Sequence, residues 1–131
     1  MTHTALPPTE CVTRFLQEAQ RLGITVRWGT EGMTNLDAAY HARPGVPGLL
    51  LLRDSPQRPG PQQLCTLLAH EMVHVLQHWK GDLKATPPLG WPRDGAPKGR
   101  RLSAQEAEAY TAQTEPAMVL KTITSLKSVD E

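Results

Sequence analysis

The segment from Gln62 to Lys80 constrains the fold most, because it is long, mostly apolar and spaced like a helix. Between Gln63 and Trp79 the only formally charged residue is Glu71. At about 100° per residue, the apolar side chains fill an arc of roughly 140°; they are Leu64, Leu68, Ala69, Met72, Val75, Leu76 and Trp79. The segment therefore predicts a central helix that is buried between other elements.

The rest of the chain predicts a small α+β domain around that helix, with a short β-sheet and further C-terminal helices. At 131 residues, one compact domain over residues 1–131 is expected. Amphipathic spacing and turn residues place the elements. They are a helix over 9–22, strands over 24–28, 38–42 and 49–53, the central helix, a helix over 103–114, and a helical or mixed segment to Leu126.

Gly81 to Arg101 separates the central helix from the next one and predicts a long loop. Its 21 residues include four glycines and four prolines, which is too many for a regular element. Between Lys80 and Arg101 there are six basic residues, against the two acidic residues Asp82 and Asp94. If this loop borders a peptide-binding cleft, its basic excess favours acidic segments of the partner.

Charge and composition argue against some classes of function and predict the cellular compartment. A formal net charge of +1 gives no global field that would attract nucleic acid, so no nucleic-acid partner is expected. The longest apolar run is far shorter than the ~20 residues of a membrane span, and the N-terminal residues lack a signal-peptide pattern. A cytoplasmic protein without a membrane partner is expected. The two cysteines, Cys11 and Cys65, are interpreted as buried thiols.

His70-Glu71-Met72-Val73-His74 is an HExxH motif within the predicted central helix. Residues i and i+4 lie one turn apart on one face, where two imidazoles can share one tetrahedral Zn²⁺. His70 and His74 are therefore predicted as zinc ligands. A zinc-bound water has a pKa near ~7, and Glu71 is predicted as the general base that takes its proton. The alternative is a helix with two structural histidines.

A third protein ligand is expected on the helix that follows the loop. Glu106 and Glu108 are the candidates, and Glu106 is preferred as the carboxylate of a His₂Glu zinc site. Ser103 and Glu106 also form a capping-box pattern, in which the Glu106 side chain would bond to the backbone of Ser103 instead. In that case Glu108 becomes the ligand candidate. Another residue, or no third ligand, is the remaining alternative.

These motifs resemble those of the gluzincins, the thermolysin-like branch of the zinc metallopeptidases, and in particular the compact minigluzincins. That family pairs HExxH with a Glu on a downstream helix, often followed three and four residues later by Ala or Ser and by Asp. Glu106 and Ala109 match this layout, whereas Tyr110 stands in place of the Asp, which in the family orients a zinc-binding His. The resemblance implies a zincin-like fold and peptide-bond hydrolysis. It also implies that Leu49 to Arg53 belongs to the substrate-binding sheet.

The resulting prediction is a zinc-dependent endopeptidase that acts on a peptide or protein substrate. The alternative is a catalytically silent zinc-binding domain with a regulatory or protein-interaction role. Three further residues are interpreted more loosely. His78 lies about 12 Å along the helix from His70 and is expected to support the site or line its cleft; Gln77 is interpreted as polar filler, with bracing of a ligand as the alternative; Trp91 is expected to hold the loop to the core.

Overall fold

The structure is a computed structural model that describes residues 6–29, 37–54 and 58–129. The elements in these residues are α1 (Pro8–Arg21), β1 (Thr25–Trp28), β2 (Ala38–Arg43), β3 (Val46–Leu52), α2 (Pro61–Lys80), α3 (Ala104–Ala112) and α4 (Pro116–Thr124). The fold is therefore α+β, as the sequence predicts. None of the helices in the described part of the chain combines the length and the apolar content that crossing a bilayer requires.

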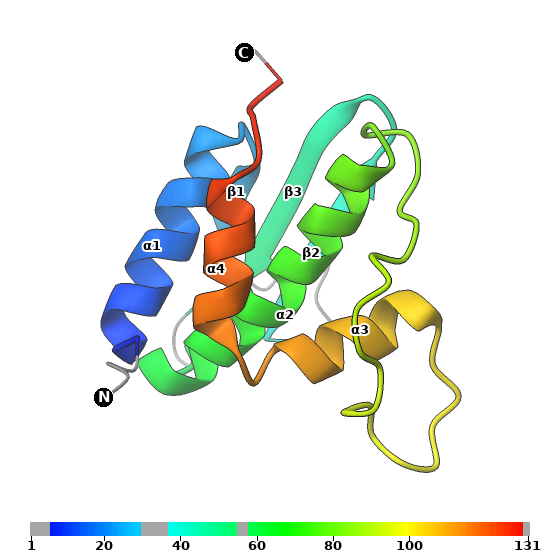
Figure 1. Cartoon of the computed structure of the whole chain (residues 1–131). Coiled ribbons are helices and arrows are strands. Elements are labelled where there is room, and N and C mark those ends of the chain that lie inside the picture. Colours follow the sequence, from blue (N-terminus) through cyan, green and yellow to red (C-terminus); the bar gives the residue numbers. More distant parts are fainter. Residues whose placement is uncertain (1–5, 30–36, 55–57, 130–131) are drawn as a thin grey trace, which may run out of the picture.

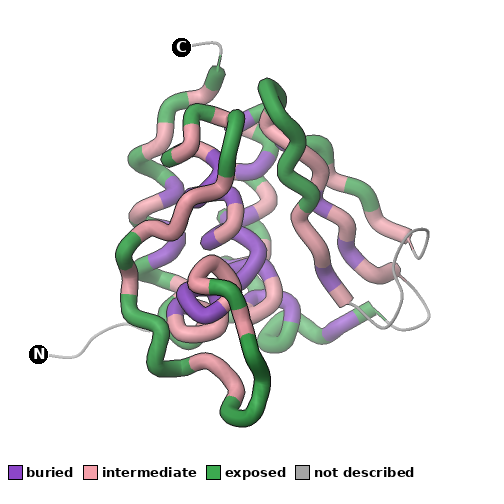
Figure 2. Tube along the Cα trace, turned by 90° about the vertical axis from the view of Figure 1, so that its right-hand side faces the viewer, coloured by how far each residue is buried: buried purple, intermediate pink, exposed green. Residues whose placement is uncertain are grey.

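The three strands form one mixed sheet in the order β1-β3-β2. β3 lies in the centre, parallel to β1 and antiparallel to β2. The helices gather on one face of this sheet, and the long loop runs from the end of α2 past α3 (Figures 1 and 2). α2 contacts β2, which is an edge strand within the described sheet. This arrangement places an edge strand beside the HExxH helix.

β3 begins at Val46, whereas the sequence predicts that this strand starts at Leu49; the predicted start is wrong. Gly48 has a φ of +102°, and a Cβ at this position would lie 2.7 Å from the carbonyl oxygen of His41. Glycine accepts both this conformation and this close approach, so the strand continues through the position.

α2 is the central helix that the sequence predicts, and twelve of its 20 residues are buried. Its apolar side packs with α1 and the inner face of the sheet, where Phe15, Leu50 and Leu52 belong to the same core. Four of its buried residues are polar: His70, Glu71, Gln77 and His78. Since buried polar groups are costly unless they are hydrogen-bonded, the partners of these four residues define what the helix does.

Cys11 and Cys65 form a disulfide bond that joins α1 to α2, which corrects the prediction of two thiols. The two residues are 54 positions apart in sequence, and the packing of α1 on α2 brings their Cα atoms to 5.6 Å. Spacing in the sequence cannot reveal such a pair, because the contact depends on how two helices pack. A closed loop of this length stabilises the fold by about 4 kcal/mol in the chain-entropy picture.

Candidate metal centre

His70 and His74 lie one turn apart on α2, with ring centroids 5.3 Å apart. Their Nε2 atoms point to one carboxylate oxygen, Oε1 of Glu106, at 3.2 Å from His70 and 2.5 Å from His74. One ligand atom from each of the three residues lies within 4.8 Å of the others. The structure thus brings together the three residues that the sequence predicts as metal ligands.

One of the two contacts of Glu106 has the spacing that a small tetrahedral ion requires. With Zn–N and Zn–O bonds of about 2.0–2.2 Å, neighbouring ligand atoms of a tetrahedral site lie about 3.3–3.5 Å apart. The contact of 3.2 Å between His70 and Glu106 is close to that spacing. The contact of 2.5 Å between His74 and Glu106 is that of a short hydrogen bond, in which a proton lies where an ion would lie. The donor set of two imidazoles and one carboxylate fits Zn²⁺.

Glu106 resolves the competition between capping and ligation, because its backbone and its side chain act separately. Its N–H donates to Oγ of Ser103 at 3.1 Å, so Ser103 caps α3. Its carboxylate contacts the two imidazoles rather than the backbone of Ser103. The capping box is therefore only half formed: Ser103 accepts the N–H of Glu106, but the Glu106 carboxylate bonds to the two histidines and not to the backbone of Ser103.

Two glutamine amides fix the orientation of the imidazoles. Oε1 of Gln113 lies 2.8 Å from Nδ1 of His70, and Oε1 of Gln77 lies 2.8 Å from Nδ1 of His74. Since an amide oxygen only accepts, each Nδ1 carries the proton and a neutral ring presents the lone pair of Nε2 to the centre. The orientation of the Gln77 amide is set by its Nε2, which donates to Glu108 and to the carbonyl of Gln105.

Without a metal, the three residues share protons. Burial alone would lower the pKa of His70 and His74, but hydrogen bonds to Glu106 outweigh it, and both pKa values lie above the ordinary 6.5. Hydrogen bonds from the same two rings hold the pKa of Glu106 well below its usual range. Protons and a metal ion therefore compete for the same three atoms.

We expect the stability gained from zinc to increase with pH. In EDTA, the contribution of the His pair is complete below about pH 6.5 and is lost as pH rises through the raised pKa values. The contribution of Glu106 is present above about pH 4.5 and is lost as pH falls through its lowered pKa. Metal-free protein should thus be most stable between these values. Thermal unfolding at pH 5.5 and 8.0 in EDTA and in Zn²⁺ measures the difference, and equal zinc effects at both pH values would contradict this competition.

Glu71 lies beside the three ligand candidates without being one of them. It is buried, its Oε1 accepts from the N–H of Tyr40 at 2.8 Å, and its Oε2 is 3.9 Å from Nε2 of His70. Burial raises the pKa of Glu71, while the nearby imidazoles oppose this rise. A carboxylate held by one oxygen, with a raised pKa and the other oxygen near the centre, has the position and the proton affinity of a general base.

A cleft of about 450 Å³ opens over the centre. Its wall includes residues 37–41 of the chain, and its floor includes His70, Glu71, His74 and Glu106. β3 precedes α2 and belongs to the sheet, as the resemblance implies, but both of its edges are paired. Within the described residues, the edge strand beside the cleft is β2, whose Tyr40 donates its N–H to Glu71.

Glu108, the alternative ligand candidate, faces away from the His pair and holds the long loop. The residue is fully buried, and its carboxylate accepts the backbone N–H groups of Leu89, Gly90 and Trp91 at 2.7–2.9 Å. Burial alone would raise the pKa of Glu108, but these bonds and one from Gln77 leave it below the usual value. Gln77 bonds to both His74 and Glu108. It therefore braces a ligand candidate, which is the alternative interpretation, and is not polar filler.

His78 and Tyr110 also have roles that differ from the sequence-based ones. His78 is 1% exposed, and its Nε2 lies 2.8 Å from the carbonyl oxygen of Val46, so it joins α2 to the β2–β3 hairpin rather than serving the cleft. Tyr110 packs the edge of its ring on His70, with centroids 4.7 Å apart. The amide that orients His70 belongs to Gln113 instead, the C-cap residue of α3.

Sequence reasoning missed Gln113, although a signal existed. Glu106, Tyr110 and Gln113 are spaced i, i+4 and i+7, so they lie on one face of α3. Once Glu106 faces the histidines, the other two residues must face them as well. Trp91 packs against the core as predicted and also lines a second cavity.

Comparisons with family models, with curated proteins and with solved structures gave no match to this chain.

Proposed function

We propose that this chain is a zinc-dependent peptidase of gluzincin-like design, which hydrolyses peptide bonds of a peptide or protein substrate. The observation that carries the proposal is the convergence of His70, His74 and Glu106 with Glu71 next to them. A purely structural zinc site would not need a buried carboxylate that turns one oxygen toward the ligands. The cleft and the edge strand β2, which the described residues leave without a second neighbouring strand, supply a place for an extended substrate.

Each residue of the centre has a distinct task in this proposal. His70, His74 and Glu106 would hold the ion, while Gln113 and Gln77 keep Nδ1 protonated and Nε2 available. When bound, Zn²⁺ supplies a Lewis acid that polarises a carbonyl and acidifies water. Glu71 accepts a proton from the attacking water and later gives it to the leaving amine. The N–H of Tyr40 keeps the carboxylate of Glu71 in place during both transfers.

The test of metal binding is the zinc content of three purified forms of the chain. We expect near-stoichiometric zinc in the unchanged protein, a loss of about 100-fold or more in affinity in Glu106→Ala, and an unchanged value in Glu10→Ala. Glu10 lies in the first turn of α1 and provides a carboxylate control outside the site. Elemental analysis and competition with a chelating dye give the stoichiometry and the affinity.

Two outcomes would lead to different conclusions. If the unchanged protein takes up no zinc, His70 and His74 are histidines that bond to Glu106 only, and the peptidase proposal fails. If zinc binds but no peptide is cleaved, the silent zinc-binding domain is favoured over the enzyme.

The sequence predicts a cytoplasmic location, whereas disulfides such as Cys11–Cys65 are rare in reducing compartments. The compartment therefore stays a prediction.

A further inference from the structure

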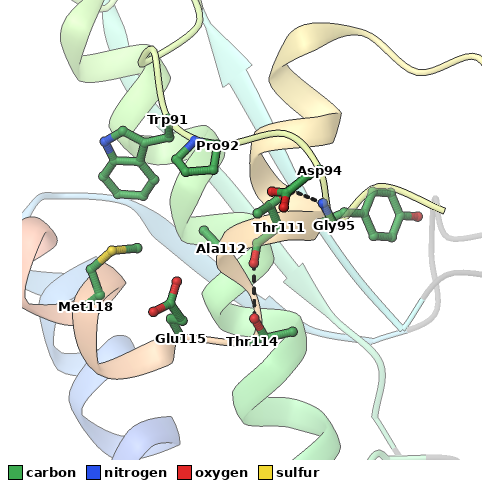
Figure 3. Close-up of a pocket in the computed structure, with 10 residues that line it drawn as sticks. Trp91, Pro92, Asp94, Gly95, Thr111, Ala112, Thr114, Glu115 and Met118 are labelled. Atoms are coloured by element: carbon green, nitrogen blue, oxygen red, sulfur yellow. Dashed lines mark hydrogen bonds between the residues drawn. The ribbon is translucent and has the colours of Figure 1, made fainter.

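A second cavity, of about 550 Å³, lies between the long loop, α3 and the start of α4 (Figure 3). Its apolar surface comes mainly from Trp91, Pro92, Ala112 and Met118. Met118 is 39% exposed, so its side chain is accessible to a ligand in the cavity. The size and the apolar walls suit one long side chain of a bound peptide.

The charged residues that line this cavity are all acidic. Asp94 and Glu115 line it, and none of the ten lining residues is basic, although the loop as a whole is rich in basic residues. Figure 3 shows the Glu115 carboxylate beside Met118, with Trp91 and Pro92 of the loop above them. Glu115 is the N-cap residue of α4, but its side chain makes no capping bond. In the described part of the chain, neither carboxylate has a hydrogen bond or an ion pair.

The wall that the loop contributes is held in place by bonds to α3. Glu108 accepts the N–H of Trp91, and Oγ1 of Thr111 accepts the N–H of Gly95 at 2.9 Å. These bonds fix both ends of the segment 91–95 that lines the cavity. A ligand would therefore enter a preformed site and would not have to order the loop first.

The cavity lies next to the metal centre. Tyr110 lines both this cavity and the cleft, and its ring packs on His70. A peptide that lies in the cleft can thus place a nearby side chain into the cavity. The indole of Trp91 and the carboxylate of Glu115 together match a planar cation, because a guanidinium stacks on an aromatic face and donates hydrogen bonds from its edge to a carboxylate.

We propose that this cavity is a specificity pocket for an arginine side chain of the substrate. The proposal rests on the proposed peptidase function for its biological meaning, but the binding event itself needs no catalysis. It assigns the stem of the arginine to Met118 and Pro92, its plane to Trp91 and its charge to Glu115 and Asp94. The net positive charge of the whole loop favours acidic substrate segments. Residues 91–95, which line the cavity, would instead bind a basic side chain.

The experiment compares two blocked pentapeptides, Ac-Ala-Ala-Arg-Ala-Ala-NH₂ and its citrulline counterpart, which has the same shape but no charge. The full chain carries Glu71→Gln so that neither peptide is cleaved. NMR titrations follow the Trp91 indole and the Met118 methyl group, in EDTA and in Zn²⁺. We expect the arginine peptide to shift both signals and to bind about fivefold more tightly, with the preference falling as salt rises.

Variants separate this pocket from a general attraction of cations. Glu115→Gln should remove the preference for arginine, whereas Glu10→Gln on α1 should keep it. Equal binding of the two peptides, or shifts confined to the cleft residues, would overturn the proposal. An arginine preference that persists in a chain that binds no zinc would support the pocket while the peptidase proposal fails. Zinc binding without the preference would leave the peptidase proposal standing and refute the pocket.

Discussion

Replacing Glu71 by glutamine is expected to lower peptide hydrolysis by about two to four orders of magnitude while leaving zinc bound. The amide keeps the size of the side chain, and its oxygen can still accept the N–H of Tyr40, so the cleft should keep its shape. What the variant loses is the basic oxygen near His70 that takes a proton from water. Steady-state hydrolysis of a mixed peptide library, together with zinc content, measures both properties on one preparation.

The interpretation of the Glu71 variant depends on two comparisons. Glu10→Gln on α1 changes the same chemical group at an exposed position and should leave hydrolysis and zinc content unchanged. Glu106→Ala should lose hydrolysis together with zinc, which is the opposite pattern to Glu71→Gln. Hydrolysis that persists in zinc-loaded Glu71→Gln would mean that another group takes the proton, and the role assigned to Glu71 would be refuted.

The parts of the site that the sequence predicts are those that depend on a single helix or on short spacing. His70, Glu71 and His74 follow from the motif and the helical period, and the buried course of α2 follows from its lack of charge. For the third ligand the sequence favours Glu106, with Glu108, another residue or no third ligand as the alternatives. The choice between Glu106 and Glu108 depends on the rotation of α3 against α2, which no local pattern encodes.

The parts that the sequence does not predict depend on packing between distant segments. The disulfide between Cys11 and Cys65 requires α1 to lie on α2. The start of β3 depends on Gly48, because only tertiary contacts show that its conformation continues a strand. The bonds from Glu108 to residues 89–91 depend on the path of a loop that has no periodic pattern. For this reason the sequence cannot distinguish Glu108, which holds the loop, from Glu106, which faces the histidines, and both are predicted as ligand candidates.

Replacing Glu108 by glutamine is expected to weaken zinc binding by about 10- to 100-fold, although Glu108 contacts no ligand atom. Its Oε1 accepts from Gln77 and Leu89, and its Oε2 accepts from Gly90 and Trp91. An amide NH₂ at either place would face backbone or side-chain donors and leave them unpaired. Gln77 would then lose the partner that sets its amide, and with it the bond to Nδ1 of His74.

A loss of loop order alone must be distinguished from this relay, and Thr111→Val provides the matched control. Thr111 holds the loop at Gly95, and in the described residues its hydroxyl bonds to Gly95 and Ala107 rather than to Gln77. Its variant should therefore speed cleavage by trypsin after the exposed Arg93 without changing the affinity for zinc. In a double-mutant cycle, Gln77→Ala and Glu108→Gln should weaken zinc binding by less together than the sum of their separate effects, because both act on His74 through one bond. If the zinc affinity of Glu108→Gln matches that of Thr111→Val, the carboxylate only fastens the loop and His74 is oriented by Gln77 without it.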